Sequence, residues 1–211
     1  MLSTYNKSIV KTKPNYHHGD LRYAIIDRAL SWIEAKDISS LSLRGIAREL
    51  EVSHNAPYRH FADKETLLVE IARIGFTELG QWLQQIEDID CQPKEKIKAL
   101  GVKYIQYAVS HAAYYRVMYD TSYDRAKHPE LEAVFRETFN ILTEAIAEGQ
   151  ARETIKPEDT KQLAYVCWSL VHGVSMLSLD RQLTISDIGS LDNLARLATE
   201  MTIEGLKNNA T

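Results

Sequence analysis

Residues 41–68 read LSLRGIARELEVSHNAPYRHFADKETLL, and this stretch decides the fold of the N-terminal part of the chain. Its first portion predicts a short amphipathic helix over 43–50, because its leucine and isoleucine side chains recur at helical spacing. A turn of three to four residues leads to a second short helix, predicted over about 54–60. Two short helices joined by a tight turn have the layout of a helix-turn-helix.

In such a unit the second helix enters the DNA major groove, and the first lies across its back near the phosphates. The side chains suit this task, because Asn55 offers a bidentate amide for adenine and His54 or Arg59 can reach guanine acceptors. Ser42 and Ser53 stand at cap positions, where neighbouring backbone N–H groups can bind phosphate. The same spacing also fits two short helices that expose polar side chains without binding DNA.

A long helix is predicted from Lys64 to about Glu87, with Asp63 placed to cap it. A lysine in the first turn gains nothing from the helix dipole, so we expect Lys64 to contact a phosphate. The 3.6-residue period is repeated in predicted helices over 20–36, 94–112, 114–119, 130–152, 158–179 and 190–207. No stretch alternates as a strand does, so we expect an all-α protein of about nine helices.

Composition is that of an ordinary globular protein. The chain has 211 residues, of which 45% are hydrophobic and 26% charged, which excludes low-complexity disorder and collagen-like repeats. Cys91 and Cys167 lie far apart without a CxxC partner, which is typical of a reduced compartment. Charges interrupt every apolar run, and the first 22 residues lack the apolar core of a secretory signal. We therefore expect a soluble, cytoplasmic protein without a membrane span.

Charge is distributed unevenly along the chain. Residues 1–64 contain ten Lys and Arg against seven Asp and Glu, a net charge of +3, and because the whole chain carries −4 the rest carries −7. A basic head on an acidic body indicates that only the head approaches a polyanion. The basic arm over residues 1–18 either contacts DNA, through a minor groove or along phosphates, or is a flexible solvated tail.

The stretch quoted above strongly resembles the N-terminal domain of the TetR (tetracycline repressor-like) transcription regulators. The family's motif runs from a helix and a turn to Tyr-x-His-Phe and a lysine that opens a long helix, matched by Tyr58, His60, Phe61 and Lys64. The preceding NYHHGDLRYAIIDRAL, residues 15–30, resembles the family's first helix and its lead-in. Trp168, His172 and Gly173 resemble the Trp-x-x-x-His-Gly element in the ligand-binding domain of one subgroup.

The resemblance implies a three-helix DNA-binding domain over 19–65 and a helical effector-binding and dimerisation domain over 66–211. It also implies phosphate and positioning contacts by Ser42, Arg44, Tyr58 and Lys64, and base contacts by His54, Asn55 and His60. Two positions depart from the family pattern. Glu51 replaces the usual turn glycine, which costs about 1 kcal/mol if φ is positive, and Asn55 stands where glycine is common. These two departures bear on which operator sequence the domain recognises, and not on whether it binds DNA.

A palindromic operator requires two copies of a reader, because its half-sites are related by a two-fold axis. The predicted helix over 158–179 is apolar almost all round, and the one over 190–207 carries a leucine-rich stripe. One face of each can serve the monomer's core and the other a partner, so we expect a homodimer through these two helices. A helix wholly buried in one monomer is the alternative.

The middle of the chain is rich in tyrosine, and aromatic walls with a few hydroxyls are typical of a small-molecule pocket. Plain core packing is the alternative for each of these side chains. The candidates for binding an unidentified effector are Tyr104, Tyr107, Tyr115, Met118, Tyr119, Phe139, Trp168 and His172.

These features favour a ligand-responsive, DNA-binding repressor that a small molecule releases from its operator, by moving the helix that begins at Lys64. A helical protein-interaction module, or a DNA-binding protein without a sensor, is the alternative. His17, His18 and Asp20 do not form a convincing metal site, because adjacent histidines on a lead-in rarely converge on one ion. Since no catalytic motif is present, we expect neither an enzyme nor a cofactor.

Overall fold

The computed structural model describes residues 18–86, 92–184, 186 and 189–208, so the predicted arm up to residue 17 and Cys91 lie outside the described residues. Over the described ranges the protein is all-α, as predicted, with one isolated bridge between Ile155 and Lys207. Its α-helices are α1 (His18–Ala35), α2 (Leu43–Glu49), α3 (Lys64–Gln84), α4 (Pro93–Ser110), α5 (Ala112–Met118), α6 (Pro129–Ala151), α7 (Thr160–Leu179) and α9 (Leu191–Leu206). Three short 3-10 helices are η1 (Ile38–Ser40), η2 (Pro57–Arg59) and η3 (Arg125–Lys127).

Polar caps account for where several of these helices begin. The Ser42 hydroxyl accepts a hydrogen bond from the Gly45 N–H at 3.1 Å, and the Asp63 carboxylate accepts one from the Thr66 N–H at 2.8 Å. Both caps were predicted, and each satisfies a backbone donor that the first helical turn leaves without an intrahelical partner. The predicted cap at Ser53 is wrong, because the next helical segment begins only at Pro57 and has Ala56 at its N-cap. Pro93 and Pro129 open α4 and α6, where a missing N–H costs nothing.

The second helix of the predicted helix-turn-helix is shorter than expected. Residues 54–56 form a turn, and only Pro57–Arg59 is helical, with 3-10 hydrogen bonding. Pro57 explains the difference, because it has no N–H to donate to the Ser53 carbonyl, which instead accepts from the Ala56 N–H at 2.9 Å. The turn before it has Glu51 at φ 55, the left-handed conformation considered for this position.

Hydrogen bonds from Val52 to Ala47 and from Glu51 to Arg48 complete a Schellman motif at the end of α2, which holds this turn. Asn55 is not among the described residues with positive φ, so a left-handed backbone does not explain its place in the pattern.

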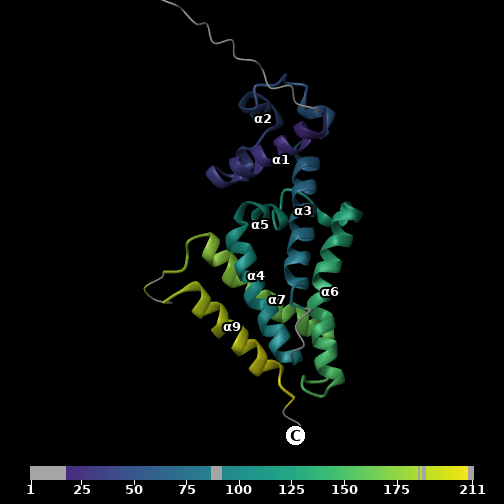
Figure 1. Ribbon diagram of the computed structural model, residues 1–211, viewed down its shortest axis with the longest axis vertical. Helices are drawn as coiled ribbons and strands as arrows, with labels where there is room; N and C mark the ends of the chain where they lie inside the picture. The colour runs from purple at the N-terminus through teal and green to yellow at the C-terminus, as the bar shows by residue number, and fades with distance from the viewer. Residues whose placement is uncertain (1–17, 87–91, 185, 187–188, 209–211) are drawn as a thin grey trace, which may run out of the picture.

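The molecule is elongated, with α1 and α2 at one end and a helical body that extends to the other (Figure 1). The long helix α3 begins in the first part and runs into the second, where it packs against α5 and α6. In the body, α4 packs against α7 and α9. Helix α5 also contacts α1, so it links the two parts a second time.

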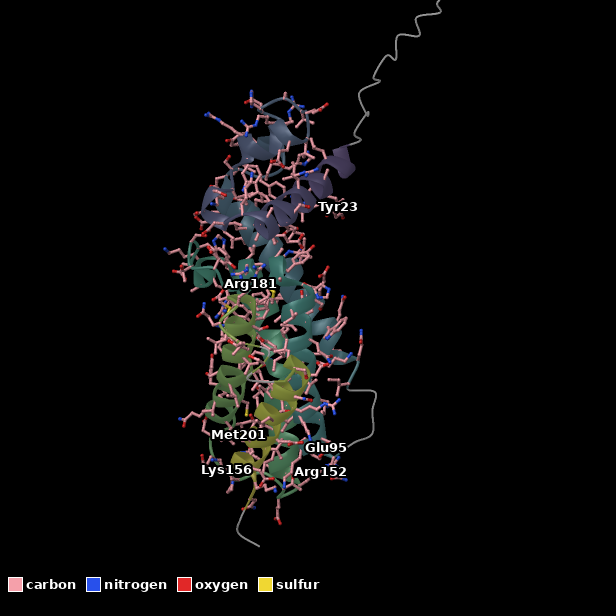
Figure 2. All side chains as sticks on the ribbon, turned by 90° about the vertical axis from the view of Figure 1, so that its left-hand side faces the viewer. Tyr23, Glu95, Arg152, Lys156, Arg181 and Met201 are labelled. Carbon is pink, nitrogen blue, oxygen red and sulfur yellow. The ribbon has the colours of Figure 1, made fainter. Side chains whose placement is uncertain are left out.

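Helices α7 and α9 lie side by side on the face turned toward the viewer in Figure 2, where Met201 of α9 is labelled. This face exposes large apolar side chains, namely Tyr165, Val166, Leu170, Leu177, Leu197 and Met201, which we call the α7–α9 face. By length and composition alone, α7 is the one helix in the described part of the chain that could cross a membrane. Apolar helices of water-soluble proteins meet the same two criteria.

Candidate functional site

The predicted DNA contacts gather at the α1–α2 end of the molecule. Seven of them are exposed and form what we call the tip surface: Ser42, Arg44, Ser53, His54, Asn55, Tyr58 and Arg59. The aromatic ring of Tyr58 is among the exposed large side chains of the protein, at 44% exposure. His60 and Lys64, the other two predicted contacts, are partly buried.

The short segment that carries the tip surface is anchored from below. Pro57, the first residue of η2, is buried, and so is Phe61, two residues after its end. The guanidinium of Arg22 lies 4.7 Å from the centre of the Phe61 ring. Arg22 also donates to the His60 carbonyl at 3.4 Å and pairs with Glu70 of α3 at 2.8 Å. Sequence reasoning missed this positioning residue, because its partners lie some forty residues further along the chain.

Lys64 has an internal role that its sequence position did not reveal. Its ammonium group donates to the carbonyl of Ile38 at 2.6 Å and to that of Ser39 at 3.1 Å. These bonds tie the η1 turn to the start of α3, which accounts for a lysine in the first helical turn. A phosphate contact by the same group stays a prediction.

The body contains a largely apolar cavity between α3, α4, α6, α7 and α9. The space it encloses is in part continuous with solvent. Four of the predicted ligand contacts line it, namely Tyr104, Tyr119, Phe139 and Trp168.

The other four predicted contacts lie outside the cavity wall. Tyr115 and His172 stand behind it and hydrogen-bond to the Tyr104 hydroxyl at 2.9 and 3.1 Å. Tyr107 is buried away from the cavity, and its hydroxyl donates to the Gly75 carbonyl at 2.9 Å. Met118 is buried against the same glycine, so closely that any side chain at position 75 would meet the Met118 sulfur. Tyr107 and Met118 therefore support α3 without facing the cavity.

Sequence reasoning missed most of the cavity wall. The further lining residues are apolar or small, namely Phe76, Leu79, Leu83, Ile97, Leu100, Gly101, Phe135, Thr138, Leu142, Cys167, Val171, Thr199 and Thr202. Their helical spacing is that of ordinary core positions, so only the three-dimensional packing distinguishes them.

Polar groups gather at and behind one place on the cavity wall, in what we call the hydroxyl cluster: Tyr104, Tyr115, Tyr119, Trp168 and His172. The Tyr104 hydroxyl lies 2.9 Å from the Tyr119 hydroxyl and accepts from the Trp168 indole N–H at 2.9 Å. Tyr115 lies 2.7 Å from Nδ1 of His172. Three helices, α4, α5 and α7, together with Tyr119 at the end of α5, thus converge on one hydrogen-bonded group.

Burial sets the protonation of this cluster. It raises the pKa of Tyr104 well above its ordinary value and that of Tyr119 to about 12, so both phenols stay protonated. Burial also lowers the pKa of His172, which keeps the imidazole neutral near pH 7. The cluster consequently offers neutral hydrogen-bond donors and acceptors and no net charge.

The cavity and the tip are connected through two helices. Helix α3 begins at Lys64 beneath the tip and contributes Phe76, Leu79 and Leu83 to the cavity. Helix α5 carries Tyr115 of the hydroxyl cluster and packs against α1. The guanidinium of Arg116, also on α5, donates to the Leu179 carbonyl at the end of α7 at 2.7 Å. No group of three or more metal-binding side chains occurs in the ranges that the structure describes.

Comparison with known proteins agrees with this arrangement. The profile "Bacterial regulatory proteins, tetR family" matches residues 25–71, and the profile "Tetracyclin repressor-like, C-terminal domain" matches residues 97–202. No curated protein matches the sequence.

Solved structures share the whole architecture. A protein of unknown function from Rhodococcus sp. RHA1 is 29% identical with a TM-score of 0.79, and the match covers 92% of this chain and 99% of that one. The fatty acid degradation regulator FadR from Bacillus halodurans is 16% identical with a TM-score of 0.72, over 88% and 95% of the two chains. The ketosteroid transcriptional regulator KstR2 of Mycobacterium tuberculosis is 17% identical with a TM-score of 0.66, over 89% and 95%. At these identities the latter two show a common fold.

Proposed function

Because the chain belongs to the tetracycline repressor-like family of transcription regulators, we propose that it is a repressor that a small molecule releases from a palindromic operator. Members of this family bind DNA operators, form homodimers and respond to small-molecule effectors; they are soluble, cytoplasmic regulators and not enzymes. The operator, the effector and the direction of the response are specific to this protein.

The observation that carries the proposal is the position of α3. Its N-terminal end supports the tip surface, and its middle forms part of the cavity wall. A ligand that enters the cavity pushes on the helix that positions the tip, so the two sites are coupled. To reduce operator occupancy a hundredfold, the ligand must favour the non-binding arrangement by about 2.7 kcal/mol.

We assign the DNA contacts within a domain over residues 19–65, with the remaining 66–211 as effector and dimer domain. Ser42, Arg44, Tyr58 and Lys64 bind or position phosphates, and Ser53 adds a backbone phosphate site. His54, Asn55, Arg59 and His60 face the bases. The exposure of seven of these nine side chains supports the assignment, since base reading requires side chains that are not occupied by core packing. The basic arm is a further candidate for groove or phosphate contact.

Dimerisation through α7 and α9 brings two tips onto one operator. The α7–α9 face supports this proposal, because monomeric proteins rarely expose so many large apolar side chains side by side. A two-fold axis through this face also explains the composition of α7, with one side in the core and the other on the partner.

We also propose that the Trp-x-x-x-His-Gly element belongs to effector sensing. Trp168 and His172 both reach the Tyr104 hydroxyl, which places the two matching side chains in one hydrogen-bonded cluster. A Cβ on Gly173 would meet nothing within 4 Å inside the protomer, so packing within one chain does not require a glycine there. Close approach of the partner's helix would require it.

The proposal is tested by operator selection followed by ligand release. The purified protein is used to select duplexes from a random library, and footprinting then maps the protected bases. We expect a palindrome whose half-sites lie about one helical turn apart, protected only in the absence of effector. Failure to select any preferred sequence, or an effector that binds without changing operator affinity, would refute it.

A further inference from the structure

We propose that the effector is an uncharged, largely apolar molecule that carries one hydrogen-bond-accepting oxygen, such as an ester, ketone or alcohol, and is not a carboxylate or an amine. This inference rests on the proposed function, because it assigns a ligand chemistry to the cavity of the regulator. Three observations carry it: the wall of the cavity, the state of the nearby cations, and the hydrogen bonding of the hydroxyl cluster.

The cavity wall is suited to an apolar body. Of the described residues that line it, none is Asp, Glu, Lys, Arg or His, and most are aliphatic or aromatic. Burying an isolated charge against such a wall carries a free-energy penalty of several kcal/mol unless a counter-charge accompanies it. The wall therefore disfavours any ligand that carries a charge into it.

Arg125 and Lys156, whose charges act on the cavity-lining Tyr119 and Cys167, are both already engaged. Arg125 donates to Glu132 at 2.7 Å, and its guanidinium lies 3.5 Å from the centre of the Phe135 ring. Lys156 pairs with Glu158 at 3.3 Å. A ligand carboxylate would have to share its counter-charge with Glu132 or Glu158, which already pair with these two cations.

The hydroxyl cluster contains a hydrogen-bond donor that can turn from the cluster to a ligand. A phenol makes one donated and two accepted hydrogen bonds, yet four polar atoms surround the Tyr104 hydroxyl within 3.1 Å, from Tyr115, Tyr119, Trp168 and His172. One of these contacts is always in excess of what the hydroxyl can satisfy. The Tyr119 hydroxyl accepts from Tyr104, so its own proton is available to a ligand oxygen. Trp168 can redirect its indole N–H to such an oxygen while Tyr104 stays satisfied, and both side chains line the cavity.

The protonation of the cluster matches a neutral acceptor. With His172 neutral, Nδ1 accepts the Tyr115 proton when the ring proton is on Nε2, so the cluster provides no positive charge for an anion. Protonated phenols donate to an oxygen of an ester, ketone or alcohol without any ionisation. An ammonium group would find hydroxyl acceptors here but no anion.

The test uses four probes that share a twelve-carbon alkyl chain and differ in the head group: methyl dodecanoate, dodecanol, dodecanoate and dodecylamine. Their affinities for the full-length protein are measured by titration calorimetry near pH 7.5, where the carboxylate and the amine are charged. We expect the ester and the alcohol to bind at least tenfold more tightly than either charged probe. Equal or tighter binding of dodecanoate, or no binding of the neutral pair up to their solubility limit, would overturn the proposal.

A pair of variants tests the role of the cluster. Tyr119→Phe should weaken binding of the ester about three- to tenfold, as expected for the loss of one hydrogen bond, and should leave binding of dodecane unchanged. Tyr123→Phe is the matched control, because this buried phenol donates to the Val117 carbonyl at 2.6 Å outside the cavity. If both variants weaken ester binding equally, the assignment of the donor is wrong.

Operator release is measured separately with the same probes, so that the two proposals can fail independently. A charged probe that releases the operator would leave the proposed function intact and refute the ligand class. Neutral probes that bind in the cavity without changing operator affinity would confirm the ligand class and refute the proposed function.

Discussion

Val166 provides the sharpest test of how two copies assemble. Val166 is 69% exposed in the protomer and belongs to the α7–α9 face. A Val166→Glu substitution should leave the protomer folded, since an exposed position tolerates a polar side chain within about 0.5 kcal/mol. In a two-fold dimer the same change buries two carboxylates against an apolar surface.

Each buried carboxylate without a partner costs about 3 kcal/mol, so the symmetric pair costs about 6 kcal/mol. This corresponds to a dimer dissociation constant that is raised about ten-thousandfold. We therefore expect the Val166→Glu variant to be a monomer at micromolar concentration. Sedimentation velocity measures the change, and thermal unfolding checks that the variant is folded.

Val109→Glu is the matched control, because Val109 is an exposed valine, at 41%, on α4 outside the α7–α9 face. The control should sediment as the wild type does. If Val166→Glu also stays dimeric, or the wild type is itself a monomer at micromolar concentration, the assignment of this face to a dimer is refuted.

Three further substitutions separate other parts of the account. Lys64→Ala should lower the stability of the protein by about 1 to 2 kcal/mol in denaturant titrations, because it removes the bonds to the Ile38 and Ser39 carbonyls, and should weaken binding to all duplexes by a similar factor. Asn55→Ala should keep the wild-type stability and change which sequence is preferred in gel-shift titrations on a duplex panel; an equal loss on every sequence in both variants would contradict this division of roles. His172→Asn should reduce the fall in Tm between about pH 7.5 and pH 5.5, because below the ordinary histidine pKa the unfolded chain takes up a proton that the buried His172 resists; an unchanged pH profile would contradict the burial effect.

Local rules were sufficient to predict much of the DNA-binding part. Ser42 and Asp63 act as caps because a short polar side chain before an apolar helix has few other uses, and the predicted helix bounds agree with the structure within a few residues. The exception is the second helix, where the missing N–H of Pro57 limits it to a 3-10 turn.

The cavity could be predicted only in part, because contacts distant in sequence create it. Tyr104, Tyr119 and Trp168 come from three separate segments, and nothing in their local spacing shows that their polar atoms meet. The same holds for Arg22, whose contact with Phe61 joins residues 39 positions apart, and for Lys64, whose carbonyl partners precede it by some twenty-five residues. Composition indicated an aromatic pocket, but it could not separate residues that line the pocket from those that stand behind it.

The salt dependence of operator binding tests the central claim most directly, because phosphate neutralisation releases counterions in proportion to the number of cationic contacts. Fluorescence anisotropy would follow the protein on its selected palindrome and on a scrambled duplex from low to physiological salt. We expect a log–log slope of roughly −3 to −5 per half-site, with the palindrome bound more tightly than the scrambled duplex throughout. A flat response, or equal affinity for the two duplexes, would contradict the claim that the tip surface reads DNA.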